Sequence, residues 1–203
     1  MENETHVIPD SAIKGIASGL IMMAVFTLVW AGIAYGGLKD IGYWFILIVF
    51  PVLSILFFVN AIKLFKAAKH FPKPASAADI AEEKKTGKWF GIIFATEGLG
   101  IFIGINIVVN LGHPELTMPV LALVVGLHFF PLARVFKRKF DYYLATWSTL
   151  IAVLAIVLSL NKTFNQSEVF ALLGIGIAIA TSSYGIYMIL NGRRLLKLQP
   201  VIL

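Results

Sequence analysis

The chain of 203 residues contains no cysteine, and this absence excludes several kinds of chemistry. Without thiols there is no disulfide, no thiolate metal site, no Cys-x-x-Cys-His haem attachment and no cysteine nucleophile. The His-Glu-x-x-His and Gly-x-Ser-x-Gly signatures and the glycine-rich phosphate loop are also missing. The sequence therefore shows no enzyme signature, and we predict no cofactor and no metal site.

Charged residues are scarce too. They make up 14% of the chain, whereas 59% of the residues are hydrophobic and the mean hydropathy is +0.86. An ordinary soluble domain carries roughly 25% charged residues. So little polar material cannot cover a surface that faces water, which makes the lipid bilayer the expected partner of this chain. We predict one integral membrane domain over residues 1–203.

The sequence contains six long apolar segments. A helix needs about 20 apolar residues to cross a bilayer, and the segments cover residues 15–37, 41–62, 89–112, 116–133, 142–160 and 169–190. They predict an all-α fold with six transmembrane helices. The longest connection covers residues 66–88. In it, Ser76 to Asp79 has the form of a capping box, which predicts a short surface helix over residues 77–86.

The basic residues lie mainly on one side of this arrangement. Of the 17 lysines and arginines, 15 fall before the first span, after the sixth, or in the loops after the second and fourth spans. Only Lys39 and Lys162 fall on the other side. Because cytoplasmic loops carry the basic excess, both termini are expected in the cytoplasm. The basic residues then mark topology, and nucleic acid is not an expected partner.

The second, fourth and sixth spans end alike, in residues 60–66, 131–137 and 191–197. Each begins with Asn or Pro, and a basic residue follows at the third and sixth positions beyond it. The pattern predicts three repeated helical hairpins. The alternative interpretation is that every helix running inward needs a basic end, which produces a similar pattern without repetition.

Glu97 is the one formally charged residue inside a predicted span. An ionisable group in lipid costs about 2.5–3.5 kcal/mol on insertion scales, so it is expected to face the interior. Gly100 and Gly104 share its helical face, where another helix can approach closely. The side chain expected to meet it is His128 in the fourth span, at a depth that differs by only roughly 4 Å.

The Glu97–His128 pair has two interpretations. A carboxylate and an imidazole balanced between charged and neutral forms can carry protons. Alternatively, a protonated Glu97 only holds the helices together. In the sixth span, Thr181 and Tyr184 are candidates to line a polar path, although hydroxyl groups in membrane helices more often serve packing.

The segment Gly126-Leu-His-Phe-Phe-Pro-Leu-Ala-Arg134 resembles a Gly-x-His-Phe-x-Pro-Leu-Ala stretch of small, uncharacterised bacterial multi-pass membrane proteins. The resemblance covers about ten residues. It implies a bacterial inner membrane and adds interest to His128 and Pro131, but it implies no activity. The layout of three hairpins is also similar to that of small bacterial acid-resistance membrane proteins. That likeness is one of architecture, which does not fix function.

The leading hypothesis is therefore a small transporter, channel or proton-responsive membrane protein that uses the interior between the third, fourth and sixth spans. Glu97 and His128 would relay or gate charge, and Thr181 and Tyr184 would line the path. The first alternative is a structural or accessory subunit, which fits a homo-oligomer or a membrane partner protein. The second is an intramembrane enzyme that uses the pair as general acid and base on a lipid-like substrate.

Overall fold

The computed structural model describes residues 8–38, 44–73, 77–162 and 164–198, and these contain helices and turns but no strand. Six α-helices and one short 3₁₀ helix, η1, follow one another: α1 (Asp10–Leu38), α2 (Trp44–Ala68), α3 (Ala77–Asn110), η1 (Pro114–Leu116), α4 (Thr117–Val135), α5 (Lys139–Leu160) and α6 (Gln166–Leu198). All six α-helices are long and apolar enough to span a membrane. The predicted all-α, six-helix membrane fold is confirmed.

The helices differ from the predicted segments mainly at their ends. Helix α3 begins at Ala77 and runs without a break into its apolar part. The separate surface helix predicted over residues 77–86 is therefore wrong, because those residues form the first turns of α3. Gly87 does not end the helix, since a single glycine costs only about 1 kcal/mol there. Residues 41–43, the predicted start of the second span, lie outside the described residues.

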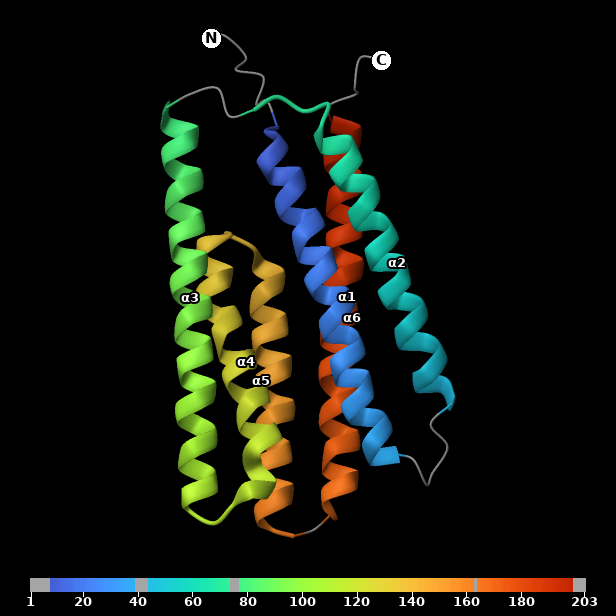
Figure 1. Ribbon diagram of the computed structural model, residues 1–203, viewed down its shortest axis with the longest axis vertical. Helices are drawn as coiled ribbons and strands as arrows, with labels where there is room; N and C mark the ends of the chain where they lie inside the picture. The colour runs from blue at the N-terminus through green and yellow to red at the C-terminus, as the bar shows by residue number, and fades with distance from the viewer. Residues whose placement is uncertain (1–7, 39–43, 74–76, 163, 199–203) are drawn as a thin grey trace.

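The helices do not pack in the order of the chain (Figure 1). Helix α1 lies between α2 and α6, and α5 lies on the other side of α6. Helix α4 packs along α5, and α3 lies at the edge of the bundle, where it packs along α4. The interior predicted between the third, fourth and sixth spans is therefore divided, because α4 is the helix that connects α3 to the rest.

Close approach of α1 and α6 depends on two glycines. A Cβ atom at Gly174 would lie 2.7 Å from the Trp30 carbonyl oxygen, and a Cβ at Gly37 would lie 2.5 Å from the Ala171 amide nitrogen. Such distances leave no room for any side chain. The Gly-x-x-x-Gly pairs at residues 15–19 and 32–36 play a smaller part. Of these four glycines, only Gly19 is a position where an added Cβ atom would have a neighbour within 4 Å.

The buried apolar residues form two clusters along the length of the bundle. The first joins α1, α2, α6 and the beginning of α5, and it includes Phe57, Leu20 and Met188. The second joins the same helices and α4, and it includes Trp30 and Ala152. Among the described residues, no residue of α3 belongs to either cluster. The core therefore centres on α1 and α6.

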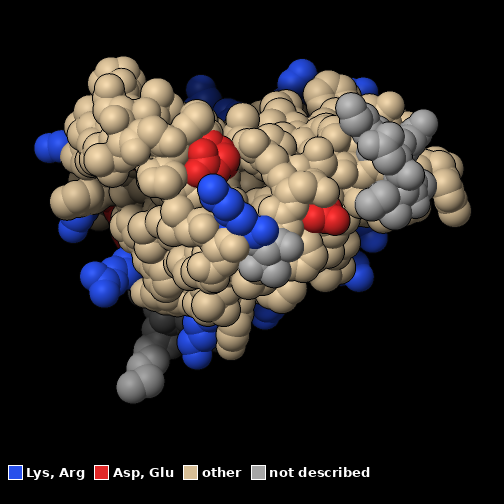
Figure 2. Space-filling model, turned by 90° about the horizontal axis from the view of Figure 1, so that it is seen from below, with Lys and Arg blue, Asp and Glu red and all other residues tan. Residues whose placement is uncertain are grey.

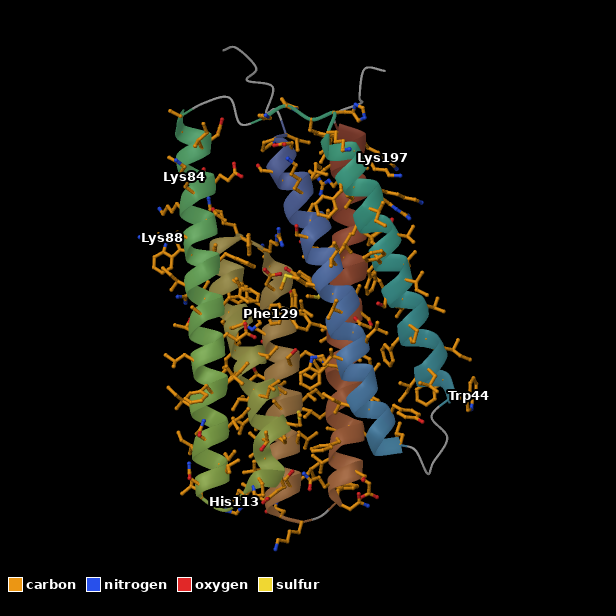
Figure 3. All side chains as sticks on the ribbon, viewed as in Figure 1. Trp44, Lys84, Lys88, His113, Phe129 and Lys197 are labelled. Carbon is orange, nitrogen blue, oxygen red and sulfur yellow. The ribbon has the colours of Figure 1, made fainter. Side chains whose placement is uncertain are left out.

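The two ends of the bundle differ in charge. Lys84, Lys88 and Lys197 lie toward one end, and Trp44 and His113 lie at the other (Figure 3). The second end is mostly uncharged, as the view from below shows (Figure 2). The described helix ends that were predicted to face one side therefore gather at the basic end. There, the turn between α4 and α5 is recessed below the ends of α3 and α6 (Figure 1).

The recessed turn also bears on the predicted repeat. Lys137, at the last basic position of the second copy, adopts a left-handed φ of 53°, whereas Lys66 and Lys197 are helical. The three helix ends thus share a sequence pattern but not one backbone geometry. Repetition of the hairpins stays a prediction.

Candidate functional site

Glu97 faces α4, in agreement with its glycine-rich helical face. A Cβ atom at Gly100 would lie 3.2 Å from the Val124 side chain, and one at Gly104 would lie 2.7 Å from Val120. The two valines of α4 therefore fill the space that the glycines leave. Glu97 lies one turn before Gly100, which brings its side chain into the same interface.

His128 meets Glu97 across this interface. The Nδ1 atom of His128 lies 3.4 Å from Oε1 of Glu97. The side chains are 9% and 12% exposed, respectively, so both are almost withdrawn from the surface. The buried Nδ1 atom makes no hydrogen bond with a described residue. The contact is therefore electrostatic, at a distance from which a small movement would form a hydrogen bond.

Aromatic rings surround His128. The Phe94 ring of α3 packs edge-on, with centroids 5.6 Å apart, and the Phe129 ring lies 4.3 Å from the imidazole. Both rings are apolar, and they shield the imidazole from its surroundings. An unbalanced charge here is costly, because the low local dielectric strengthens every electrostatic term.

Thr181 lies elsewhere. Its hydroxyl accepts a hydrogen bond from Thr27 of α1 at 3.0 Å and donates to the Ala178 carbonyl at 3.1 Å. Both threonine side chains are buried in the contact between α1 and α6. Thr181 therefore joins two helices and does not share a site with Glu97.

Tyr184 belongs to a second polar cluster, at the basic end. Nη1 of Arg138 donates a hydrogen bond to the Tyr184 hydroxyl at 3.2 Å. Asp141, in the first turn of α5, interacts electrostatically with both residues. Its side chain is fully buried, and neither carboxylate oxygen has a hydrogen-bond partner among the described residues.

Sequence reasoning missed Asp141 and Arg138. Both lie just outside the predicted span at residues 142–160, where charged residues are expected to meet water. A signal was available in the position of Asp141, since an acidic side chain in the first turn of a helix interacts favourably with the helix dipole. Its complete burial follows from the packing of α5 against α6, which the sequence pattern alone does not give.

Phe129 separates the two polar groups. Its ring lies 4.3 Å from His128 on one side and 6.0 Å from the Tyr184 ring on the other. Phe129 is partly buried and packs against the first apolar cluster. The structure thus brings Glu97 and His128 together, leaves Tyr184 beyond an aromatic ring and leaves Thr181 in the contact between α6 and α1. No group of three His, Asp or Glu side chains among the described residues is placed to hold a metal ion.

No protein-family model matches this chain, and no curated protein or solved structure was found to be similar to it. What the site can do therefore follows from its geometry. A carboxyl and an imidazole in contact within an apolar interface can share, take up or release a proton. They lie between α3 and the helix that connects α3 to the bundle.

Proposed function

We propose that this protein is a proton-responsive membrane protein in which the Glu97–His128 pair controls the packing of α3 against α4. The observation that carries the proposal is the 3.4 Å contact between two nearly buried ionisable groups. It occurs at the most weakly held helix of the bundle, in which Ile93 is the one buried residue.

The number of protons on the pair decides how strongly it holds the two helices together. With one proton, the pair is either an ion pair or a neutral hydrogen-bonded pair, and both forms attract. With two protons, a lone imidazolium is left in the interface. With none, a lone carboxylate is left there. Both lone charges are unfavourable in apolar surroundings, so α3 is expected to loosen at acid and at alkaline pH.

The nearest other ionisable cluster does not take part directly. Arg138, Asp141 and Tyr184 lie beyond the Phe129 ring, at the end of α5. A cavity at that end is lined by α1, α6 and the α4–α5 turn, and neither Glu97 nor His128 lines it. A transporter or channel needs a continuous polar path past its ionisable residues. The geometry therefore supports a proton response better than flux through the pair.

The proposal includes an orientation and a location. We place the basic end, with both termini, in the cytoplasm, because the basic excess of a membrane protein lies on that side. The bacterial inner membrane follows from the resemblance around His128. Glu97 would then lie in the cytoplasmic half of the membrane, where it can respond to protons that enter from that side.

A double-mutant cycle tests the proposal, with Glu97→Gln, His128→Gln and the double variant. We expect a coupling free energy of about 0.6–1.7 kcal/mol near neutral pH, the range measured for polar pairs between membrane helices. The midpoint of thermal unfolding in detergent should pass through a maximum with pH. Glu97→Gln should remove the decrease on the alkaline side, and His128→Gln should remove the decrease on the acid side. Glu83→Gln, at an exposed position of α3, is the control.

A coupling near zero, with an unchanged pH profile in every variant, would overturn the proposal. Proton flux in liposomes provides a separate check. Flux that Glu97→Gln abolishes would favour the transporter or channel hypothesis in its place.

A further inference from the structure

A cavity of about 480 Å³ lies at the basic end of the bundle, between α1, α6 and the α4–α5 turn. Its apolar wall includes Ile16 of α1 together with Met188 and Leu195 of α6. Its polar groups are Arg138, Asn191, Arg194 and Tyr187. Two guanidinium groups thus converge on a cavity whose lining contains no acidic side chain.

Arg138, which lines this cavity, is held in a defined orientation. Nη1 donates to the Tyr184 hydroxyl at 3.2 Å, and the guanidinium lies over the Phe136 ring, 4.6 Å from its centroid. An arginine that is already ordered loses little conformational entropy when it binds a ligand. No other N–H group of Arg138 donates a hydrogen bond to a described residue.

The charges around the cavity remain positive. Asp141 is fully buried, interacts electrostatically with Arg138 and does not line the cavity, so it offsets part of the charge of that arginine without facing a ligand. On α1, Asp10 is paired with Lys14 at 2.6 Å. Arg194 is exposed and forms no ion pair among the described residues. The positive charge of Arg194 is therefore available to an anion.

The position of the cavity relates these charges to the membrane surface. Arg138 immediately precedes α5, whose 22 residues are about 33 Å long, close to the thickness of the hydrocarbon core. The guanidinium therefore lies at the level of the lipid headgroups. The turn that carries Arg138 is recessed below the ends of the longer helices α3 and α6 (Figure 1).

We propose that this cavity binds the phosphate group of an anionic phospholipid, independently of the Glu97–His128 pair. Arg138 and Arg194 contact the phosphate, for which guanidinium groups are well suited because they donate two parallel hydrogen bonds. The apolar wall accommodates the glycerol and the first part of the acyl chains. Basic pockets between transmembrane helices on the cytoplasmic side bind such headgroups. A soluble phosphate ester offers the same chemistry, and the experiment distinguishes the two sources.

Native mass spectrometry of the full-length protein in detergent tests the site. Dioleoyl-phosphatidylglycerol is titrated against dioleoyl-phosphatidylcholine, and inorganic phosphate and glycerol 3-phosphate are titrated separately. The matched variants are Arg194→Gln, which lines the cavity, and Arg193→Gln, which is its exposed neighbour outside the lining. Both remove one positive charge from the same turn of α6. Arg138→Gln is the stronger variant, and its fold is checked by thermal unfolding.

We expect phosphatidylglycerol to be retained in preference to phosphatidylcholine. Arg194→Gln should weaken its binding about 10-fold, the loss expected for one charge-assisted contact. Arg193→Gln should change binding by less than about 2-fold, as for a screened surface charge. Binding of the soluble phosphates with the same dependence on Arg194 would support the site and assign it to a soluble ligand. Equal losses in both variants, or no preference for any phosphate anion, would overturn the proposal.

Discussion

Helices α6 and α3 have almost the same length, 33 and 34 residues, but fifteen residues of α6 are buried and only one residue of α3 is. Both contain several glycines. In α6, Gly174 and Gly185 lie against α1 and α2. In α3, a Cβ atom added at Gly91 or Gly98 would have no neighbour within 4 Å. The comparison teaches that apolar length places a helix in the membrane, whereas the face on which its small residues lie decides whether it occupies the centre or the edge.

The polar contacts of α6 and α3 lie in interfaces of different size. In the interface of α1 and α6, the hydrogen bond between Thr27 and Thr181 is added to backbone packing that is already close. In the interface of α3 and α4, the Glu97–His128 contact accompanies a much smaller buried surface. A contact of similar strength should therefore matter more for the position of α3 than for that of α6.

The largest effect is expected at the centre of the bundle, for Gly174→Val. The new side chain would overlap the backbone of α1 at Trp30 and Ala34, which cannot rotate away. The helices must separate, at a cost of about 3 kcal/mol or more. Unfolding in detergent, followed by circular dichroism, measures the loss. Gly32→Val is the control, because nothing lies within 4 Å of a Cβ at Gly32. Similar losses of stability in both variants would show that Gly174 has no special role in the contact of α1 and α6.

A smaller effect is expected for Gly104→Val at the edge. The clash there is with the Val120 side chain, and α3 can move outward because only α4 holds it along most of its length. We expect a loss of about 1 kcal/mol and increased backbone hydrogen exchange in α3 alone. Gly98→Val, at an open position of the same helix, is the control. Increased exchange spread over α1 and α6 as well would contradict the edge position of α3.

The smallest effect is expected for Thr27→Val. Valine keeps the packing and removes one donor, while Thr181 still donates to the Ala178 carbonyl. Hydrogen bonds between membrane helices contribute about 0.6 kcal/mol on average, so the loss should be of that size and independent of pH. Thermal unfolding at several pH values measures both properties. A loss above about 2 kcal/mol would mean that polar contacts dominate even the closely packed interface.

Much of the fold could be predicted, because the six apolar segments and the loops that contain the basic residues can be read directly from the sequence. The approach of Glu97 to His128 could also be predicted, since both lie at similar depths in helices joined by a short turn. The location of Thr181 and the burial of Asp141 could not. They depend on α6 packing against α1 on one side and α5 on the other, an order that the sequence pattern does not specify. The first part of α3 was misjudged as a separate surface helix over residues 77–86, whereas the helix continues through Gly87 into the apolar segment. Ser76 of the predicted capping box lies outside the described residues.

The pH dependence of the position of α3 tests the central claim most directly. Because the chain has no cysteine, spin labels can be attached at Leu99→Cys in α3 and Leu190→Cys in α6, both exposed sites, without further changes. The matched pair is Val25→Cys in α1 with Leu190→Cys. We predict that the distance from α3 to α6 broadens and increases at acid and alkaline pH. Glu97→Gln should remove the alkaline response, which needs the carboxylate, and His128→Gln should remove the acid response, which needs the imidazolium. The distance from α1 to α6 should stay constant. An α3 distance that does not depend on pH, or an alkaline change that is equally large in Glu97→Gln, would contradict the account.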